Sequence, residues 1–342
     1  MALSKIVGGS IRSIVNIIPK DTYDNLQENL IPEVERESMV SHTGIRFRRK
    51  FDISKTDTHR LFAEGISNTL NSLNWAPETI SALVCVTQTP PTRIPAVSCL
   101  LHHEFNFAPS AACLDINLGC SGYVYGLHQC FSLLQNQLQG SGRALLCCGD
   151  ISSLLVQNDK TTTPIFSDAI SVTALEFDNL HKENPLVSYF NLETLGSGHT
   201  AIRSDFDENN REVMRLNGIE VFNYSVQFVP RHIKSLLSEI EGLEIPVVVL
   251  HQANKLINDA IAKRIPLPDA AFPSTLYQYG NTASASIPIT LVDYLSTLSP
   301  KQFPKHALLS GFGVGFSMGS AVVPISSDLN INTLSLSTSV NS

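Results

Sequence analysis

The sequence predicts an α/β protein of two halves, and two observations lead to this fold class. Short aliphatic segments alternate with segments whose apolar residues recur at helical spacing over residues 80–177, and the alternation restarts over residues 221–325. This rhythm of strand and helix is typical of a mostly parallel sheet covered by helices on both faces. A charged, turn-rich stretch at residues 178–211 separates the two series. We therefore expect an N-terminal half over residues 1–179 and a C-terminal half over residues 180–342.

The individual elements follow from continuous aliphatic runs, which indicate buried strands, and from apolar residues at a period near 3.6, which indicate helices. In the first half the expected order is strand 80–89, helix 95–107, strand 112–120, helix 121–138, strand 142–150 and strand 170–177. In the second half it is helix 221–239, strand 245–253, helix 254–265, helix 284–295, and a strand, glycine turn and strand within 306–325. The Ser/Thr/Asn-rich tail from Ser326 is expected either to fray or to add an edge segment.

The composition excludes several classes of protein. The chain has 342 residues, of which 43% are hydrophobic and 16% charged, so it can bury a sizeable core. Its net charge of −7 argues against a general nucleic-acid binder, which needs a basic face. The seven cysteines lie mostly in apolar runs, as in a reducing compartment, and no aliphatic run is long enough to span a membrane. We expect a cytoplasmic protein that binds neither nucleic acid nor membrane.

The first candidate site residue is Cys120, in "DINLGCSGYVYGL" at residues 115–127. It lies where a predicted strand turns into a predicted helix, so its thiol faces the free N–H groups of the helix N-terminus. We expect these groups to lower the pKa of the thiol, to favour the thiolate and to hold an oxyanion. "GCSG" by itself is equally compatible with a structural cysteine beside a glycine turn.

Two further polar residues follow predicted strands or turns in the second half. His251 begins "HQAN" at the carboxyl end of an aliphatic strand, where open α/β sheets place their ligands, although one such histidine is more often structural. Asn281 lies in the turn "YGNTASASIP", where a helix cap is the commoner role. The glycines of "GFGVGFSMG" at residues 311–319 lie between two strands, so they favour close backbone approach to a ligand over nucleotide binding.

Taken together, Cys120, His251 and Asn281 resemble the catalytic set of the thiolase superfamily, and most closely that of β-ketoacyl-acyl-carrier-protein synthase III. The resemblance spans nearly the whole chain and includes "SHTGIRFRR", "GCSGYVYGL", "IFSDA", "HQANKLI", "YGNTASASIP" and "GFGVGFSMGSAVV". It implies a thiolase-like five-layered α/β/α/β/α fold of two pseudo-duplicated halves, a homodimer, and no metal or redox cofactor.

The resemblance also implies a reaction. Cys120 would take an acyl group from a CoA thioester. His251 and Asn281 would bind the thioester carbonyl of malonyl-acyl carrier protein, because loss of CO2 leaves an enolate oxyanion that needs neutral donors. The carbanion would attack acyl-Cys120 to give a 3-oxoacyl product, with the backbone N–H groups of Cys120 and Val314 holding the second oxyanion.

Further positions match substrate-binding residues of the family. Phe222 and Phe312 match apolar residues near the active-site tunnel, Asn254 a residue thought to bind pantetheine or water, and Lys160, loosely, an arginine beside the CoA adenine. Three cations that follow "HQAN" could meet the acidic carrier protein, or could be a solvated helix face: Lys255, Lys263 and Arg264.

Departures from the family pattern indicate a specialised member and put CoA as the acyl donor in doubt. Ser38 stands where housekeeping members carry a tryptophan that stacks on the adenine, and Lys160 lacks the planar stacking surface of arginine. "FSDAISV" replaces "FGDGAGA", although Asp168 remains, and Ile219 replaces a frequent asparagine. "TQTPPTRIP" at residues 87–95, where the partner subunit shapes the acyl pocket, also differs, so the acyl specificity should differ too.

Two other functions remain open at this point. The acyl group on Cys120 could pass, without decarboxylation, to an amine, a hydroxyl or an amino sugar, with His251 as general base. The chain could instead be a non-catalytic partner subunit, although such subunits usually lack the cysteine or the His/Asn pair.

Overall fold

Two mixed β-sheets form the framework of the computed structural model, which describes residues 2–138, 141–156, 158–178, 185–240 and 242–336. The first sheet has the order β15-β2-β8-β7-β5-β6. Its strands are β2 (Gly9–Pro19), β5 (Ile80–Val86), β6 (Ala112–Ile116), β7 (Ser141–Asp150), β8 (Ala169–Asp178) and β15 (Asn330–Leu336). The second sheet has the order β1-β9-β14-β13-β12. Its strands are β1 (Ala2–Val7), β9 (Val187–Thr194), β12 (Val247–Leu250), β13 (His306–Gly313) and β14 (Ser317–Pro324).

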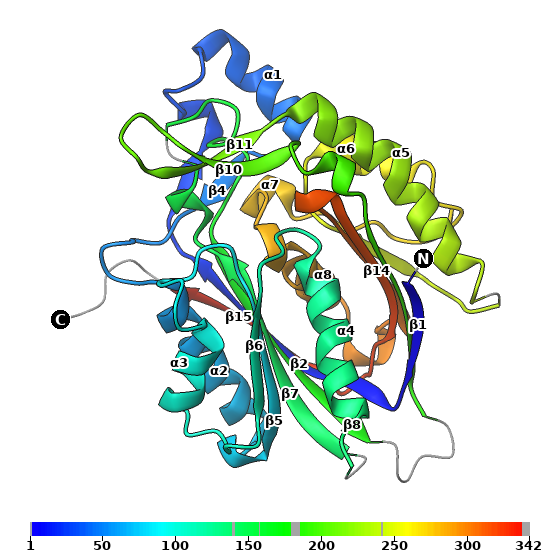
Figure 1. The fold of residues 1–342 in the computed structure, drawn as a ribbon. Coiled ribbons are helices and arrows are strands. Elements are labelled where there is room, and N and C mark those ends of the chain that lie inside the picture. Colours follow the sequence, from blue (N-terminus) through cyan, green and yellow to red (C-terminus); the bar gives the residue numbers. More distant parts are fainter. Residues whose placement is uncertain (1, 139–140, 157, 179–184, 241, 337–342) are drawn as a thin grey trace.

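Helices cover and separate the two sheets, so that the molecule has five layers (Figure 1). On the outer face of the first sheet lie α2 (Thr58–Leu73) and α3 (Val97–Glu104), and on the outer face of the second lie α5 (Gly218–Leu237) and α6 (Lys255–Ala262). The middle layer, between the sheets, is formed by α4 (Gly122–Gln135) and α8 (Ser286–Ser296). This arrangement is the α/β/α/β/α fold that the resemblance implied.

Smaller elements are attached to this framework. They are α1 (Glu33–Thr43), α7 (Leu276–Tyr279), a hairpin of β3 (Thr22–Asp24) with β4 (Phe47–Arg49), and a hairpin of β10 (Ile202–Phe206) with β11 (Glu212–Leu216). Among the residues described, no helix is long and apolar enough to cross a membrane.

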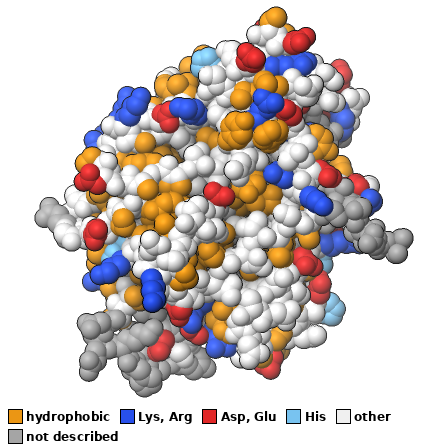
Figure 2. Space-filling model, turned by 180° about the vertical axis from the view of Figure 1, so that it is seen from behind, with side chains coloured by type: hydrophobic (Ala, Val, Ile, Leu, Met, Phe, Trp, Pro, Cys, Tyr) orange, Lys and Arg blue, Asp and Glu red, His pale blue; other side chains and the backbone are white. Residues whose placement is uncertain are grey.

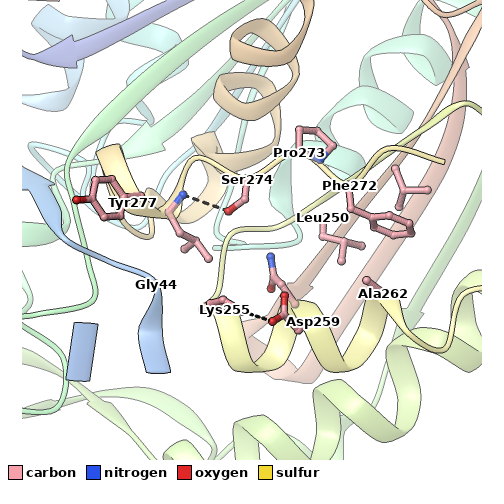
Figure 3. Close-up of a pocket in the computed structure, with 12 residues that line it drawn as sticks. Gly44, Leu250, Lys255, Asp259, Ala262, Phe272, Pro273, Ser274 and Tyr277 are labelled. Atoms are coloured by element: carbon pink, nitrogen blue, oxygen red, sulfur yellow. Dashed lines mark hydrogen bonds and ion pairs between the residues drawn. The ribbon is translucent and has the colours of Figure 1, made fainter. Parts of the chain in front are cut away.

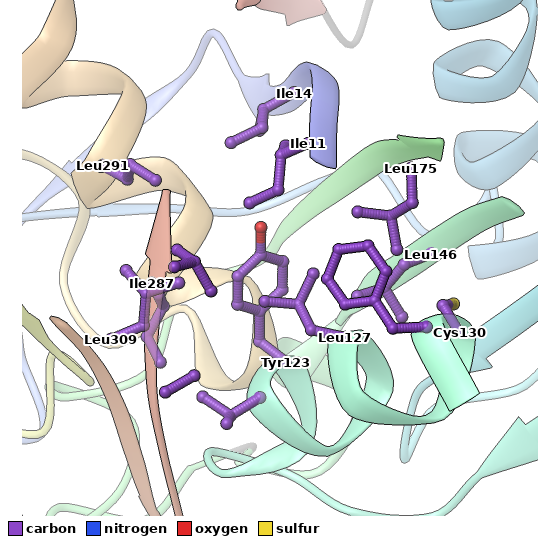
Figure 4. Packing of buried hydrophobic residues seen from close by; sticks show 14 of the residues in the cluster. Ile11, Ile14, Tyr123, Leu127, Cys130, Leu146, Leu175, Ile287, Leu291 and Leu309 are labelled. Atoms are coloured by element: carbon purple, nitrogen blue, oxygen red, sulfur yellow. The ribbon is translucent and has the colours of Figure 1, made fainter. Parts of the chain in front are cut away.

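The middle layer exists because α4 is apolar on nearly all sides. Figure 4 shows Tyr123 and Leu127 of α4 between Ile11 and Leu175 of the first sheet and Leu309 of the second. Tyr123 is fully buried, and its hydroxyl satisfies its hydrogen-bonding need with Thr173 Oγ1 at 3.1 Å. A helix enclosed in this way holds its N-terminus, and hence the residue before it, in a fixed position between the sheets.

Two glycines allow α4 to approach the first sheet closely. A Cβ at Gly122 would lie 2.3 Å from Val86 Cγ1, and a Cβ at Gly126 would lie 2.4 Å from Leu146 Cδ1. Real Cβ atoms do not come so close, so larger residues would push the helix away from the sheet. The "SGYVYG" segment is therefore a packing motif as well as a helix start.

The expected strands and helices occur in the expected order, but strand direction differs from the prediction. The strands β6, β5 and β7 are parallel, as expected, whereas β7 and β8 are antiparallel. In the second sheet the described strands are antiparallel except for β12 and β13. The prediction of a mostly parallel sheet is wrong there because β13 and β14 are joined by a short turn, and a parallel connection would need a long crossover.

Each terminal strand pairs within the sheet that the other half of the chain mainly forms. The first strand, β1, pairs with β9 in the second sheet, and β15 near the C-terminus pairs with β2 in the first sheet. The tail thus adds an edge strand, one of the two outcomes expected for it. The predicted boundary at residue 179 falls among residues that lie outside the described parts, so the division into halves there stays a prediction.

The surface carries charges of both signs. On the face shown in Figure 2, acidic and basic side chains are scattered among exposed hydrophobic ones, and neither sign gathers into one large patch. This distribution agrees with the low net charge density of the chain and offers no broad basic surface on that face.

Candidate active site

A narrow cavity of about 50 Å³ brings the three predicted catalytic residues together. Cys120, His251 and Asn281 all line it, although they come from three separate parts of the chain. Apolar residues form most of the remaining wall: Ile165, Phe166, Ile202, Leu216, Val221, Ile257 and Phe312. Low polarity around a few polar groups strengthens the electrostatic interactions that those groups make.

Cys120 lies in the turn between β6 and α4, directly before the N-cap residue Ser121. It is only 5% exposed. Two glycines of β13 press against the turn: a Cβ at Gly311 would lie 2.6 Å from the Cys120 carbonyl oxygen, and one at Gly313 would lie 3.1 Å from Cys120 Sγ. The glycine-rich segment therefore allows the backbone of β13 to approach the Cys120 thiol closely.

The prediction that the helix N-terminus lowers the thiol's pKa is wrong for the folded protein. Burial raises the pKa of Cys120 to about 12, and the nearby carboxylate of Asp150 adds to the rise, while a backbone hydrogen bond opposes it. Removal of the thiol from water outweighs the attraction of the helix N-terminus for a negative charge. Cys120 is thus a neutral thiol until a substrate takes part.

His251 directly follows β12 and is 1% exposed. Its Nδ1 lies 2.7 Å from Ser286 Oγ at the start of α8, and its ring packs edge-on against Phe312 with centroids 5.5 Å apart. Burial lowers the pKa of His251 to about 3, and a hydrogen bond to the Ala283 backbone only partly offsets this. The imidazole is therefore neutral throughout the physiological range.

Asn281 is fixed by its backbone against the loop before β8. Its N–H donates to the Ile165 carbonyl at 3.0 Å, and its own carbonyl accepts from Ser167 N at 2.9 Å. Its side-chain Oδ1 accepts from Ala283 N at 3.0 Å. Because the oxygen is occupied in this way, the Nδ2 amide is the donor that Asn281 presents to the cavity.

Comparison with known proteins shows the family of the chain. Residues 114–196 match the family model of 3-oxoacyl-[acyl-carrier-protein (ACP)] synthase III, and residues 238–325 match that of the synthase III C terminal. A putative 3-oxoacyl-[acyl-carrier-protein] synthase 3 of Campylobacter jejuni is 31% identical over 276 residues, which cover 74% of this chain and 75% of that protein. The chain belongs to the 3-oxoacyl-acyl-carrier-protein synthase III family.

Other relatives of this synthase III chain extend the match. The β-ketoacyl-[acyl-carrier-protein] synthase III of Streptococcus mutans is 28% identical over 323 residues, which cover 90% of this chain and 96% of that one. The crystal structure of a 3-oxoacyl-(acyl-carrier protein) synthase from Burkholderia xenovorans aligns with a TM-score of 0.88 and 29% identity over 98% of this chain and 99% of that chain. These relatives establish an acyltransferase with the thiolase-like fold.

A structure of lower identity shares the fold and is named for a polyketide pathway. A priming β-ketosynthase of the R1128 polyketide pathway is 21% identical with a TM-score of 0.80, and it covers 94% of this chain and 97% of that one. Membership in the synthase III family therefore leaves the substrate and the pathway of this chain open.

The structure distinguishes among the predicted substrate-binding residues of this synthase. Phe312 and Asn254 line the cavity. Asn254 also caps α6, because its Oδ1 accepts from Ile257 N at 2.9 Å. Phe222 is not among the cavity residues; its neighbour Val221 is, because one step along a helix turns a side chain by about 100°. Lys160 is exposed and does not line the cavity.

Val314, proposed to supply an oxyanion donor, faces a second cavity. Val314 lines a chamber of about 310 Å³ together with Gln88, Asn117 and Glu212. Its neighbour Gly313 lines the cavity of Cys120. Ile202 lines both cavities. The role of the Val314 N–H stays a prediction.

The three predicted docking cations are all exposed, on α6 and immediately after it. Lys255 forms an ion pair with Asp259 one turn further along the helix, so its charge is already compensated. Arg264 donates to the Ala260 carbonyl at 2.6 Å, and Lys263 lies beside it. Lys263 and Arg264 are therefore the better candidates for contact with an acidic partner.

A third cavity, of about 350 Å³, lies on the other side of α6 (Figure 3). Apolar side chains such as Leu250 and Phe272 form one part of it, and Lys255 and Asp259 another. It touches the catalytic site through Asn258, whose Nδ2 donates to the His251 carbonyl at 3.0 Å. No catalytic side chain lines this cavity.

The sequence did not single out two buried residues that hold the site in place. Ser286 contacts the His251 ring, and Asp150 accepts hydrogen bonds beneath the Cys120 turn. The signal for Asp150 was present, because a carboxylate that ends the aliphatic run "ALLCCGD" must be paired if it is buried.

Proposed function

We propose that this synthase catalyses a decarboxylative Claisen condensation. An acyl group is loaded on Cys120, and malonyl-acyl carrier protein extends it to a 3-oxoacyl product. The observation that carries the proposal is the convergence of one thiol and two neutral hydrogen-bond donors, His251 and Asn281, in a single apolar cavity.

In the first step Cys120 exchanges with the acyl donor. Its sulfur attacks the thioester carbonyl, the bond to the donor sulfur breaks, and the thiol proton passes to the leaving thiolate. The step is balanced in protons, so it fits a cysteine that is a neutral thiol at rest. The donor is an acyl thioester, carried by CoA or by a carrier protein.

In the second step the malonyl thioester loses CO2. The electrons of the breaking carbon–carbon bond form an enolate, whose oxygen is stabilised by donors from His251 and Asn281. The enolate carbon attacks the acyl carbonyl on Cys120, the carbon–sulfur bond breaks, and the Cys120 thiolate takes a proton. The reaction as written requires no metal or redox cofactor.

The state of His251 favours this function over acyl transfer to an amine, hydroxyl or amino sugar. A general base works best when its pKa is near the working pH. With a pKa of about 3, His251 is a weak base but remains a neutral donor at every working pH. Retention of all three side chains in one cavity also argues against a non-catalytic subunit.

We further propose a homodimer and an acyl carrier protein as partners. The edge strand β6 has two exposed residues, Ala112 and Asp115, and its other residues are only half-buried, which leaves it available to pair with a second copy. Lys263 and Arg264 offer exposed positive charge for the carrier protein.

The deciding experiment supplies malonyl-acyl carrier protein with a panel of acyl-CoAs and acyl-carrier proteins, and follows CO2 together with product mass. We expect CO2 and a 3-oxoacyl product from wild type. Asn281→Ala should keep the acyl adduct on Cys120 and lose about 100- to 1000-fold in CO2 release. An adduct on wild type that passes to an amine or hydroxyl without CO2 would establish the alternative.

A further inference from the structure

Asp150 is a buried carboxylate that the proposed chemistry does not use. It ends β7, is 3% exposed, and lies close enough to Cys120 to raise the pKa of the thiol. A buried carboxylate is costly unless several donors satisfy it, so its presence near this site calls for a reason.

On one side the Asp150 carboxylate fastens the segment that packs against the nucleophile. Its Oδ1 accepts from Gln88 N at 2.6 Å and from Thr87 Oγ1 at 3.0 Å. The Gln88 side chain in turn lies against the residue before Cys120, since a Cβ at Gly119 would lie 2.6 Å from Gln88 Oε1. The carboxylate thus holds in place the Gln88 segment that packs against the Cys120 turn.

On the other side the same carboxylate fastens the segment that carries the donors. Its Oδ2 accepts from Ser284 Oγ at 3.3 Å. Ser284 lies in a short 3-10 turn, Ala283–Ala285, between Asn281 and Ser286. Residues 281–286 therefore hold the Asn281 amide at one end and the hydroxyl that contacts His251 at the other.

We infer that Asp150 is a positioning residue that fixes the distance between the Cys120 thiol and the Asn281–His251 donor pair. One oxygen binds the segment that packs against the Cys120 turn, and the other binds the turn between Asn281 and Ser286. These two segments have to keep their spacing while an enolate held by the donor pair attacks the acyl group on Cys120. Errors of about 1 Å in such an arrangement can cost 100-fold in rate. The expected effect of Asp150 on the rate rests on the proposed condensation. The expected electrostatic effect of Asp150 on the thiol does not depend on it.

The test compares Asp150→Asn with Asp168→Asn. Asp168 is a matched control because it is an equally buried carboxylate that accepts from Phe51 N and from Ser153, away from the Cys120 turn. In Asp150→Asn only one of the two side-chain atoms can still accept, so either the Gln88 N–H faces the amide nitrogen or the Ser284 hydroxyl has to turn and accept, and the hold on one of the two segments weakens. We expect CO2 release to fall at least tenfold in kcat with KM for malonyl-acyl carrier protein changed less than threefold.

A second readout follows the thiol itself. Of the titratable groups described, those that face Cys120 are Asp150 and His251, and Cys148 also faces Asp150. Because His251 is neutral, removal of the Asp150 charge should lower the thiol's pKa, and iodoacetamide should alkylate Cys120 several-fold faster at pH 9. Peptide mapping by mass spectrometry separates this from alkylation of the exposed Cys99.

The outcomes separate the inference from the proposed function. If wild type releases no CO2, the condensation fails, and the alkylation rate still tests Asp150. Unchanged kcat in Asp150→Asn, or an equal loss in Asp168→Asn, would overturn the positioning role. Should Asp150→Asn fail to fold, Ser284→Ala removes only the Oδ2 bond and should lower kcat threefold or more; a wild-type kcat there would equally overturn it.

Discussion

The Nδ1 atom of His251 lies 2.7 Å from the hydroxyl oxygen of Ser286, the first residue of α8. Both residues are buried, so water cannot replace either partner. If the Ser286 hydroxyl donates to Nδ1, the ring carries its proton on Nε2 and presents a donor to the cavity. In that arrangement the serine orients the ring and favours the tautomer that an oxyanion requires.

Removal of this hydroxyl should impair the decarboxylation step and spare the acylation step. We expect Ser286→Ala to lower CO2 release by between about 10- and 100-fold, because the imidazole loses its orientation. The acyl adduct on Cys120, followed by intact mass, should form at the wild-type rate. Thr290→Val is the control. Thr290 lies in the same helix as Ser286, and its buried hydroxyl hydrogen-bonds with Thr275 rather than with the His251 ring. Equal losses in both variants would contradict the assignment.

The neutral state of His251 also predicts how stability depends on pH. In the unfolded chain a histidine gains a proton near its usual pKa of about 6.5, whereas in the folded chain His251 does so only near 3. Between these values the unfolded state binds more protons, so the folded state loses stability as the pH falls, by about 1.4 kcal/mol per unit. Above this window the group contributes no pH dependence.

Urea unfolding of wild type and His251→Gln between pH 3.5 and 7.5 isolates this effect. Asp168, whose pKa burial raises to about 6, acts with the opposite sign between its unfolded value and 6, but it is present in both proteins and cancels. The difference in free energy of unfolding should therefore grow in favour of the variant as the pH falls. Parallel curves would show that the imidazole is protonated or solvated.

The close approach of Gly313 to the thiol predicts that a single methyl group blocks acylation. A Cβ at this position would lie 2.9 Å from Cys120 Cβ and 3.1 Å from Sγ, and φ is +156° there. We expect Gly313→Ala to abolish the acyl adduct on Cys120 in intact-mass measurements. Gly196→Ala, where a Cβ would meet nothing within 4 Å, should leave acylation at the wild-type level. Normal acylation of Gly313→Ala would mean that the strand moves freely.

The sequence predicted the site better than it predicted the sheets. His251 directly follows the aliphatic strand β12, and Cys120 lies in the turn after the strand β6, so both follow strands that the local sequence pattern predicts. The strand β9 was missed inside the charged stretch because its inner positions include polar residues such as Asn191, which is fully buried and donates to the His232 carbonyl of α5. That partner is 41 residues away in the chain, and no window around β9 contains it.

The pKa of Cys120 was mispredicted for a related reason. The helix N-terminus is visible in the sequence, but the packing of β13 against the thiol and the nearby charge of Asp150 arise only in the folded chain. The exchange of β1 and β15 between the sheets likewise leaves no local signal, since each pairs with a strand distant in the sequence. Long-range packing, which overrides local pattern, accounts for these misses.

The residue shared by the cavity of Cys120 and the 310 Å³ chamber predicts a route to altered acyl specificity. Ile202 is 7% exposed and lines both the cavity of Cys120 and the 310 Å³ chamber beside it. Ile202→Ala should join them and shift kcat/KM at least tenfold toward longer acyl donors, at a cost of about 2–5 kcal/mol in stability. Ile240→Ala, at an equally buried position of the same hydrophobic cluster that lines neither cavity, should cost similar stability and keep the wild-type preference. A longer-chain preference in both variants, or in neither, would show that the limit on chain length lies elsewhere, because only Ile202→Ala shortens a side chain that the two cavities share.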